Sequence, residues 1–386
     1  MVSFERMYSA YEDCMVRKTS SPSALQFSFI DLPKEIIVIV NDINHRTYKH
    51  SPSSCFGIEY PTAREIYAAQ FRDRVVQHFF CQEIEPLLEK VLVDNTTSCR
   101  EKKGTDYALK LLKEFVEEDS EHGTKPCWYR KIDLSGYFMS IRREYVTEQI
   151  MILIETEYHG EYKEELLYLA PIIYMNNPAK GRVMKMSLEV WNKIPERKRM
   201  NPNGTTGIAI GNITAQNGSN LNLNAFDHFC MYNLGLPHFV RYVDDVIIVN
   251  TDKQKLIDTF PAIEAKLNET GQKINHRKTK IENAYHGIKF LGKITYPYGY
   301  QKPSPEAAGR VIKSARELTI DRNVLSKLNS QAGRMKHYAS FNLLLDYMDA
   351  LPDELSSIVY YDLDKQKFGF QEGGKELCMM KEKERS

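Results

Sequence analysis

Apolar residues recur at helical spacing over residues 72–93, where they lie three or four positions apart and predict one buried face of a helix. The residues that carry this pattern are Val75, Val76, Phe79, Phe80, Ile84, Leu87 and Leu88. A second stretch, residues 253–269, places Leu256, Phe260, Ile263 and Leu267 on one face. This second pattern predicts an amphipathic helix that packs against a core.

The remaining apolar patterns predict a mixture of helices and short strands. Residues 25–50 contain apolar runs that fit either a packed helix or a strand, and residues 157–176 give a mixed pattern. Residues 351–386 are polar and predict a loose C-terminal tail. The other segments predict a hairpin over residues 51–68, strands over 128–134, 280–282 and 289–292, and helices over 105–118, 142–155, 185–194, 214–233, 306–318 and 322–348.

Two apolar runs, residues 238–241 and 246–249, flank the tetrapeptide Tyr242-Val243-Asp244-Asp245. The runs are rich in β-branched and aromatic residues, so they predict two strands with the aspartates at their tight connection. Two adjacent carboxylates beside buried strands repel each other unless a cation neutralises them. Because hard divalent cations bind carboxylate oxygens, this connection predicts half of a metal site.

The best candidate for the other half is Asp133, which ends the strand predicted over residues 128–134. Two such strands side by side would bring Asp133 and Asp244 to the same ions. Two metal ions roughly 3.5–4 Å apart can activate an attacking oxygen and stabilise a leaving oxygen in phosphoryl transfer. The alternative is that Asp133 only caps the following helix.

The composition narrows the class of protein further. Hydrophobic residues make up 42% of the 386 residues and charged residues 27%, which indicates a globular chain. The net charge of +1 gives no overall basic character, so nucleic-acid binding would depend on local patches. The seven cysteines include no CxxC pair, which argues against structural zinc. With no apolar run long enough to span a membrane and no signal peptide, a cytoplasmic protein is expected.

The motifs occur in the order found in reverse transcriptases, and the chain resembles that family across roughly residues 50–345. Residues 242–245 resemble its YxDD box, and residues 131–141 resemble its first palm motif. The resemblance implies an α+β right-hand polymerase fold. Its parts are an N-terminal extension (1–50), fingers (51–126), a palm (127–300, with fingers interleaved at about 142–205), a thumb (301–350) and the tail (351–386).

The same resemblance implies roles at the catalytic centre. Asp133 and Asp244 would bind two Mg²⁺ ions, which Mn²⁺ can replace, with the Leu134 carbonyl assisting and Asp245 in support. Phe138 falls where the family places the aromatic residue that excludes the ribose 2′-hydroxyl. Packing in the core is the alternative for that side chain.

Two further stretches resemble the fingers motifs of the family, residues 64–77 and 98–105. A triphosphate needs fixed cations, and Arg64, followed by Arg72, is the candidate for the incoming nucleotide. Arg100, Lys102 and Lys103 form a basic cluster suited to the template backbone. The alternatives are an exposed ion-pair cluster around Arg72 and a solvated turn at the two lysines.

Residues 207–216 lie where the family has the loop and helix that position the substrate. Gly211 would let the backbone approach the nucleotide closely, with Ile210 and Gln216 beside it. Most members of the family carry glutamine directly before this glycine. An aliphatic residue such as Ile210 at this position resembles the reverse transcriptases of diversity-generating retroelements. Two features depart from that clade: Ala215 replaces serine, and residues 217–220 (Asn-Gly-Ser-Asn) are polar where the clade is apolar.

Later motifs imply contacts with the primer, the template and the leaving group. Lys278 is the candidate proton donor to pyrophosphate, and a plain surface lysine is its alternative. Residues proposed for the template and primer are Tyr242, the primer-grip residues Phe290, Leu291 and Gly292, and the thumb residues Arg310, Lys313 and Arg316. The last three recur every third position, a pattern also found on ordinary solvated helix faces.

The function predicted from these motifs is the copying of a structured noncoding RNA template into cDNA from dNTPs, in a diversity-generating retroelement or a similar bacterial or phage-encoded system. An antiphage-defence reverse transcriptase is the first alternative, and a catalytically silent RNA-binding scaffold is the second. Expected partners are the noncoding RNA and either an accessory protein, a second reverse transcriptase or another copy of the chain. No membrane partner is expected.

Overall fold

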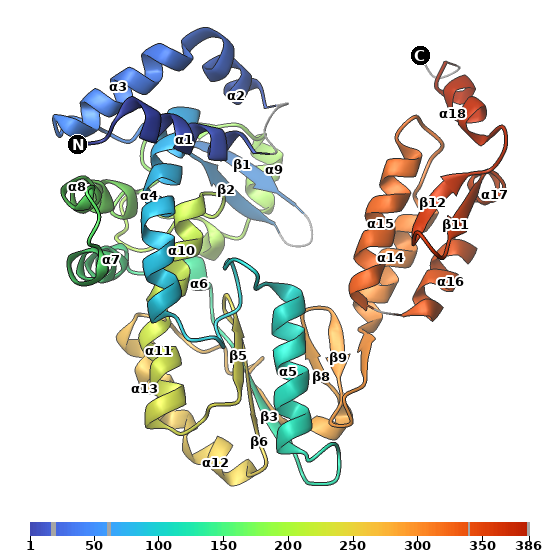
Figure 1. Ribbon diagram of the computed structural model, residues 1–386. Helices are drawn as coiled ribbons and strands as arrows, with labels where there is room; N and C mark the ends of the chain where they lie inside the picture. The colour runs from blue at the N-terminus through green and yellow to red at the C-terminus, as the bar shows by residue number, and fades with distance from the viewer. Residues whose placement is uncertain (17–20, 60–62, 339, 384–386) are drawn as a thin grey trace. The chain divides into compact units, whose positions relative to one another are not determined.

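The computed structural model describes residues 1–386 except 17–20, 60–62, 339 and 384–386 (Figure 1). The chain forms two compact units, and each is built from separate stretches of sequence. Unit 1 contains Met1–Gly104, Arg130–Ile248 and Gln254–Lys280, and unit 2 contains Thr105–Tyr129, Val249–Lys253 and Ile281–Ser386. Within the described residues, no helix has the length and apolar character needed to cross a membrane.

The N-terminal part of unit 1 is helical. Helices α1 (Phe4–Met15) and α3 (Leu32–Asn44) pack together and contact the long helix α4 (Phe71–Val91), with the short α2 (Pro22–Gln26) and η1 (Phe27–Asp31) between them. Residues 25–50, which the sequence leaves open between helix and strand, are thus mainly helical. Ile36, Ile39 and Ile43 are buried at helical spacing. The helix predicted over residues 72–93 is confirmed as α4.

The hairpin predicted over residues 51–68 is confirmed. Strands β1 (Ser54–Ile58) and β2 (Arg64–Ala68) pair antiparallel, and the short β4 (Val183–Met184) adds a parallel edge. Helix α9 (Leu188–Lys193) contacts β1, and the turn η2 (Glu196–Lys198) follows it. The hairpin therefore has one covered face, with Cys55, Glu65 and Tyr67 fully buried.

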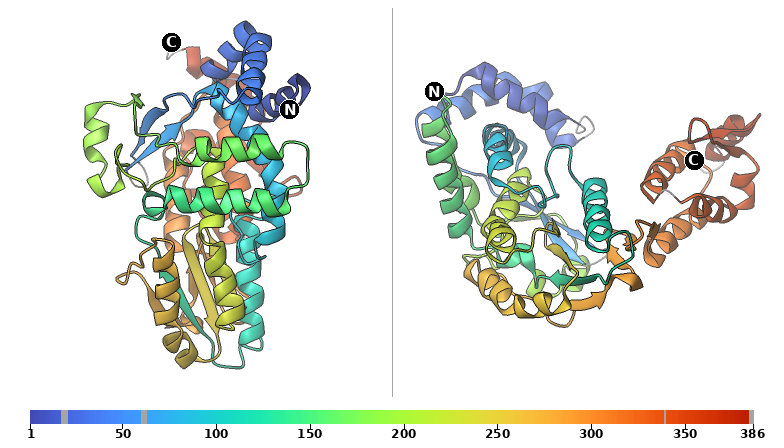
Figure 2. Two further views of the ribbon diagram at one scale, coloured as in Figure 1. Left: turned by 90° about the vertical axis from the view of Figure 1, so that its left-hand side faces the viewer. Right: turned by 60° about the horizontal axis from the view of Figure 1, so that its bottom comes forward.

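Four helices of unit 1, α4, α7 (Arg143–Glu157), α8 (Lys163–Tyr174) and α10 (Ile213–Asn222), pack against one another. Helices α7 and α8 lie side by side, and α10 contacts both of them and α4 (Figure 2). The single helix predicted over residues 214–233 is divided into α10, α11 (Asn224–His228) and the π-helical η3 (Phe229–Asn233). Residues 157–176 contain α8, although their pattern is mixed. The buried residues of α8 recur at helical spacing along one side: Glu165, Leu166, Leu169, Ala170, Ile173 and Tyr174.

The central sheet has the strand order β5-β6-β3-β7, formed by Phe239–Tyr242, Asp245–Asn250, Trp128–Asp133 and Lys280–Asn283. Four consecutive residues of β6, Val246–Val249, are buried, so both faces of this strand are covered. The helix predicted over residues 253–269 is interrupted between α12 (Lys253–Asp258) and α13 (Phe260–Glu269). Pro261 lies in the first turn of α13, where its missing N–H needs no partner.

Unit 2 combines helix α5 (Thr105–Asp119) with a small sheet of order β10-β9-β8, formed by Gln301–Pro303, Lys293–Thr295 and Ile288–Phe290. The turn η4 (Ala284–His286) precedes β8. The helix predicted over 306–318 is confirmed as α14 (Pro305–Arg316). The helix predicted over 322–348 is divided into α15 (Val324–Tyr338) and α16 (Phe341–Asp349), with Ser340 capping α16.

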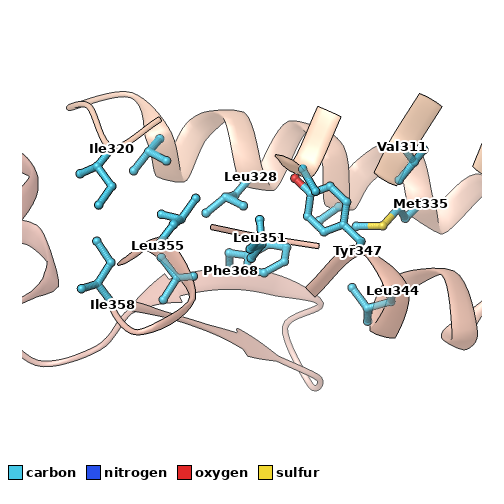
Figure 3. Close-up of a cluster of buried hydrophobic side chains, with 14 of the residues drawn as sticks. Val311, Ile320, Leu328, Met335, Leu344, Tyr347, Leu351, Leu355, Ile358 and Phe368 are labelled. Atoms are coloured by element: carbon cyan, nitrogen blue, oxygen red, sulfur yellow. The ribbon is translucent and has the colours of Figure 1, made fainter. Parts of the chain in front are cut away.

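Residues 351–383 differ from the loose tail predicted over 351–386, of which residues 384–386 lie outside the described residues. They form α17 (Asp353–Ser356), the hairpin β11 (Val359–Asp362) with β12 (Lys367–Phe370), and α18 (Gly374–Lys383). Figure 3 shows their apolar side chains pointing toward those of α14, α15 and α16. The tail is polar on average, but six of its apolar residues are buried in this core: Leu351, Leu355, Ile358, Val359, Phe368 and Cys378.

Candidate active site

The tight turn between β5 and β6 carries the tetrapeptide Tyr242–Asp245 in unit 1. Tyr242 pairs with Asp245, so Val243 and Asp244 form a two-residue connection. Val243 has φ of 58°, in the left-handed region. That conformation costs a non-glycine residue roughly 1–2 kcal/mol. The turn is therefore held in place by the structure around it.

Asp133 ends β3 in the same sheet and is tied to the segment that follows α13. Its backbone carbonyl accepts from Asn275 N–H at 2.8 Å, and its Oδ1 accepts from Asn275 Nδ2 at 3.0 Å. Lys278 Nζ lies 3.4 Å from Asp133 Oδ2. Ser135 N–H donates to the Lys273 carbonyl at 2.8 Å, and Leu134 forms a β-bridge with Ile274. These contacts fix the end of the strand and bring Lys278 to Asp133.

The electrostatics of Asp244 show that the predicted acids lie close together. Burial, together with the charges of Asp245 and Asp133, raises the pKa of Asp244 to about 6, although the charge of Arg64 acts in the opposite direction. Lys131 Nζ lies 3.7 Å from Asp245 Oδ1. The site therefore contains three carboxylates whose mutual repulsion is only partly balanced by lysines and Arg64.

This excess of negative charge fits divalent cations, and the donors are the carboxylate oxygens that magnesium prefers. Within the described residues, however, no three histidine, cysteine, aspartate or glutamate side chains are already gathered at metal-binding spacing. Instead, Lys278 forms an ion pair with Asp133, and Lys131 forms one with Asp245. Metal binding would therefore exchange these ion pairs for coordination.

Sequence reasoning missed Lys131 and Asn275. Lys131 is two residues before Asp133 on the same strand, so the two side chains share a face. That spacing could have identified Lys131. No local pattern could have identified Asn275, because its contact with Asp133 joins residues 142 positions apart.

The substrate-positioning loop joins the β1–β2 hairpin. Tyr67 N–H donates to the Ile210 carbonyl at 3.0 Å, and Ala69 N–H donates to Asn212 Oδ1 at 3.2 Å. Gly211 has φ of 118°, and a Cβ there would lie 2.8 Å from the Tyr67 carbonyl oxygen. Only glycine fits this approach. Gln216 is exposed at the start of α10, and Ile210 is half-buried.

The polar stretch in α10 also has a structural reason. A Cβ at Gly218 would lie 2.9 Å from the Tyr174 ring, so this glycine allows α10 to approach α8 closely. Asn217, Ser219 and Asn220 are buried with it.

Phe138, the residue predicted to exclude the ribose 2′-hydroxyl, lies in helix α6 (Tyr137–Ser140). Its side chain is half-buried and stacks edge-on against Tyr137, with 5.3 Å between ring centroids.

The two arginines predicted to bind the incoming nucleotide, Arg64 and Arg72, differ in their surroundings. Arg64 is exposed on β2, and its charge acts on Asp244. Arg72 instead pairs with Asp42, lies near Glu35, and stacks over Tyr48 with 5.3 Å to the ring centroid. The phosphate contact assigned to Arg72 from sequence stays a prediction, and the structure gives this guanidinium carboxylate partners within the chain.

The basic cluster over residues 100–103 is also partly occupied within the chain. Arg100 is 3% exposed, pairs with Glu89 at 2.8 Å and donates to the carbonyls of Val93 and Thr96. Lys103 pairs with Asp94 at 2.7 Å. Lys102 is 88% exposed and 3.7 Å from Glu101. Of the three, Lys102 has the side chain most accessible to a template.

The remaining predicted contacts lie in unit 2. Phe290 pairs with Lys293, so Leu291 and Gly292 form a two-residue turn, with φ of 44° and 85°. Positive φ at both positions matches the twist of a tight hairpin. Arg310, Lys313 and Arg316 are exposed along α14, and Lys313 lies 3.6 Å from Glu317.

The chain matches the model of a family described as "Reverse transcriptase (RNA-dependent DNA polymerase)" over residues 60–295. Because this match spans more than half of the chain and includes Asp133, Asp244 and Asp245, the chain belongs to the reverse transcriptases. The domain that it contains is therefore an RNA-directed DNA polymerase domain.

Solved structures agree with this fold. Telomerase from Candida tropicalis in complex with a TWJ fragment of telomeric RNA is 11% identical, with a TM-score of 0.50 over 81% of this chain and 56% of that chain. Telomerase from Candida albicans with a TWJ fragment gives 11% identity and 0.49 over 79% and 60%. The chain thus spans less than two thirds of these telomerase chains. The family match and the likeness to the Candida tropicalis structure show the right-hand polymerase fold. No curated protein matches it.

Proposed function

We propose that this protein copies a dedicated structured noncoding RNA into cDNA, in a diversity-generating retroelement or a similar bacterial system. The observation that carries the catalytic part is the pKa of Asp244, which burial and the charges of Asp245 and Asp133 raise to about 6. Three carboxylates crowded in this way need positive charge between them to stay ionised. A silent scaffold has no use for such a cluster.

Asp133 and Asp244 would hold two Mg²⁺ ions, with Asp245 in support and the Leu134 carbonyl as a further ligand. When bound, such ions activate the primer 3′-hydroxyl and neutralise charge on the phosphates. Lys278 and Lys131 balance part of the carboxylate charge when the ions are absent.

The chain's own side chains would position the substrate and move one proton. Arg64, exposed near Asp244, would bind the triphosphate. Lys278 would donate its proton to the departing pyrophosphate. Phe138 would contact the sugar and exclude a 2′-hydroxyl, while Gly211, between Ile210 and Gln216, leaves room for the nucleotide.

The template and primer would contact exposed cationic side chains and backbone groups of tight turns. Lys102, Arg310, Lys313 and Arg316 carry exposed charge suited to phosphates. The Leu291–Gly292 turn and Tyr242 would steady the primer end. We propose that the noncoding RNA is the main partner, with an accessory protein, a second reverse transcriptase or another copy of this chain completing the complex.

Primer extension on the native RNA tests the catalytic proposal. Wild-type protein should incorporate dNTPs with Mg²⁺ or Mn²⁺, and replacing Asp244 and Asp245 by alanine should reduce the rate by about a thousandfold or more, as loss of a metal ligand set does. RNA binding by the double variant should remain and should weaken as salt rises. Absence of incorporation by wild-type protein would contradict the proposal.

Sequencing the cDNA made in cells tests the biological role. Errors concentrated at template adenines would support a diversifying element, and Ile210→Gln should then change the error spectrum. The defence role would be favoured instead if the cDNA is repetitive or accurately copied and if cells that lose it become sensitive to phage. An unchanged error spectrum in Ile210→Gln would count against the retroelement assignment.

A further inference from the structure

We propose that Arg241, Asp227 and Ser98 are positioning residues that hold Val243 in its left-handed conformation and thereby aim Asp244 and Asp245. This inference rests on the proposed function, since it assigns a task to the same catalytic turn. None of the three residues is expected to touch substrate or metal, because Arg241 and Asp227 are fully buried and Ser98 is 1% exposed.

Both backbone polar groups of Val243 are bonded to this set. Its N–H donates to Ser98 Oγ at 3.0 Å, and its carbonyl accepts from Arg241 Nη1 at 3.0 Å. Ser98 belongs to the loop after α4, and Arg241 belongs to β5. The first bond comes from a loop 145 positions away and the second from the strand residue two positions before Val243, and together they fix the peptide planes on either side of Val243. Those planes set the direction of Asp244.

Asp227 determines which way the Arg241 guanidinium points. Arg241 Nε donates to Asp227 Oδ1 at 2.8 Å and Nη2 donates to Oδ2 at 2.6 Å, which leaves Nη1 directed at the Val243 carbonyl. Burial alone would lower the pKa of Arg241, but the charge of Asp227 outweighs it and raises that pKa. Thr96 Oγ1 also donates to Asp227 Oδ2 at 2.6 Å. The fork geometry is therefore rigid.

The polar residues of α10 complete the network. Asn220 Nδ2 donates to the Ser98 carbonyl at 2.8 Å, and Ser98 Oγ lies 3.2 Å from Asn220 Oδ1. Arg241 Nη2 donates to the Asn220 carbonyl at 3.2 Å. An apolar residue at position 220 could not make the two side-chain bonds with Ser98, although its carbonyl could still accept from Arg241. The departure of this helix from an apolar pattern thus has a purpose: it links the helix of the substrate-positioning loop to the catalytic turn.

The first test replaces the whole ion pair by apolar residues of similar size, Arg241→Met with Asp227→Leu. Replacing both partners leaves no buried charge, so the chain can stay folded. We expect kcat for primer extension to fall about tenfold or more, because a small misplacement of reacting groups has that effect. The KM for dNTP should change little, and the Mg²⁺ concentration for half-maximal rate should rise.

Arg130→Met is the matched control. Arg130 is a buried arginine on β3 whose Nη2 donates to the Leu256 carbonyl at 2.8 Å and whose guanidinium lies 3.8 Å from the Phe260 ring centroid. It makes a comparable set of buried contacts away from the turn. Its loss should lower thermal stability without changing kcat or the Mg²⁺ dependence.

A second series covers the case in which the double variant fails to fold. Ser98→Ala removes one hydroxyl and should lower kcat, and Ser98→Thr, which keeps the hydroxyl, should restore most of it. Glycine adopts positive φ without a Cβ penalty. The loss caused by Ser98→Ala should therefore be smaller when Val243→Gly is also present.

Amide hydrogen exchange of the 239–247 segment in metal-free protein gives a readout that needs no catalysis. Exchange in this segment should be faster in Ser98→Ala and in the double variant, and unchanged in Arg130→Met. A wild-type protein without polymerase activity would overturn the proposed function but leave this readout intact. Folded variants with unchanged exchange, kcat and Mg²⁺ dependence would overturn the positioning role.

Discussion

Glu65 shows how a single buried carboxyl in β2 makes stability depend on pH. Its side chain is fully buried, and burial raises its pKa, although the Met200 N–H, the Tyr67 hydroxyl and the charges of Arg182 and Arg199 act in the opposite direction. The folded protein therefore binds this proton more tightly than the unfolded chain. The stability that this group contributes is fully present below its unfolded pKa, about 4.3, and is lost as pH rises through the higher folded pKa.

Glu65→Gln should accordingly raise the free energy of unfolding at pH 7.5 by roughly 1–2 kcal/mol, since it removes a buried charge and keeps an acceptor for Met200. The gain in Tm should shrink as the pH is lowered toward 4.5. Glu59→Gln, an exposed carboxylate paired with Lys193, is the control and should change little at either pH. An equal gain at both pH values would contradict the assignment.

Two glycines should respond to alanine in opposite directions. Gly211→Ala should destabilise unit 1 by roughly 1–3 kcal/mol, because φ is 118° and the new Cβ would meet the Tyr67 carbonyl. Gly309→Ala, in the exposed face of α14 with nothing within 4 Å, should stabilise by roughly 0.5–1 kcal/mol. Thermal unfolding measures both, and a stabilising Gly211→Ala would show that the loop adopts another conformation.

At the scale of elements, the ordered motifs predict most of the site. The two strands around residues 242–245, the strand ending at Asp133 and the hairpin carrying Arg64 follow from local periodicity, and all three form. Helix breaks are less predictable. The local pattern does not mark the breaks near Leu223 and Ser340 within residues 214–233 and 322–348, since these breaks depend on long-range packing and capping.

The partners of charged side chains were the least predictable feature. Arg72 and Arg100 look like ligands in sequence because they stand in basic clusters, yet their carboxylates come from residues 30 and 11 positions away. Arg241 carried a signal that was available beforehand. A charged residue inside an apolar strand predicts a buried partner, since an unpaired charge there is too costly.

Arg64 and Arg72 are expected to have different roles, because Arg72 on α4 pairs with Asp42 on α3 and Arg64 is exposed. Arg64→Ala should raise the KM for dNTP about tenfold, because its exposed charge faces the catalytic acids. Arg72→Ala should lower Tm through loss of the Asp42 pair and the Tyr48 stack, while the KM stays near wild type. Steady-state kinetics and thermal unfolding of both variants provide the comparison. A raised KM in Arg72→Ala would support the phosphate contact that the sequence predicts for Arg72.

At the scale of the whole molecule, the largest difference from the sequence prediction is the hydrophobic core formed by the C-terminal elements. The average composition of residues 351–386 is polar, so it does not reveal the six apolar residues that are buried in this core. Phe368, 4% exposed, contacts the rings of Tyr347 and Tyr361 at 6.1 and 5.0 Å between centroids. Its environment is that of an interior residue.

Phe368→Ala should therefore destabilise unit 2 by about 3–5 kcal/mol, as removal of a buried aromatic ring does. Leu363→Ala, in the turn between β11 and β12 and 64% exposed, is the control and should be nearly neutral. Limited proteolysis and thermal unfolding report the difference. Near-neutral behaviour of Phe368→Ala would show that residues 351–386 are dispensable for the core.

Each of the two units is assembled from separate stretches of the chain, and this has a practical consequence. Helix α5 contacts β9, and the Leu109 carbonyl accepts from Gln301 Nε2 at 2.9 Å, so a fragment beginning at residue 281 would leave this sheet without its helix. Likewise, a fragment ending at residue 104 would lack every catalytic acid. No single cut in the gene yields two self-sufficient halves, so transplanting a part between relatives requires exchanging several stretches at once.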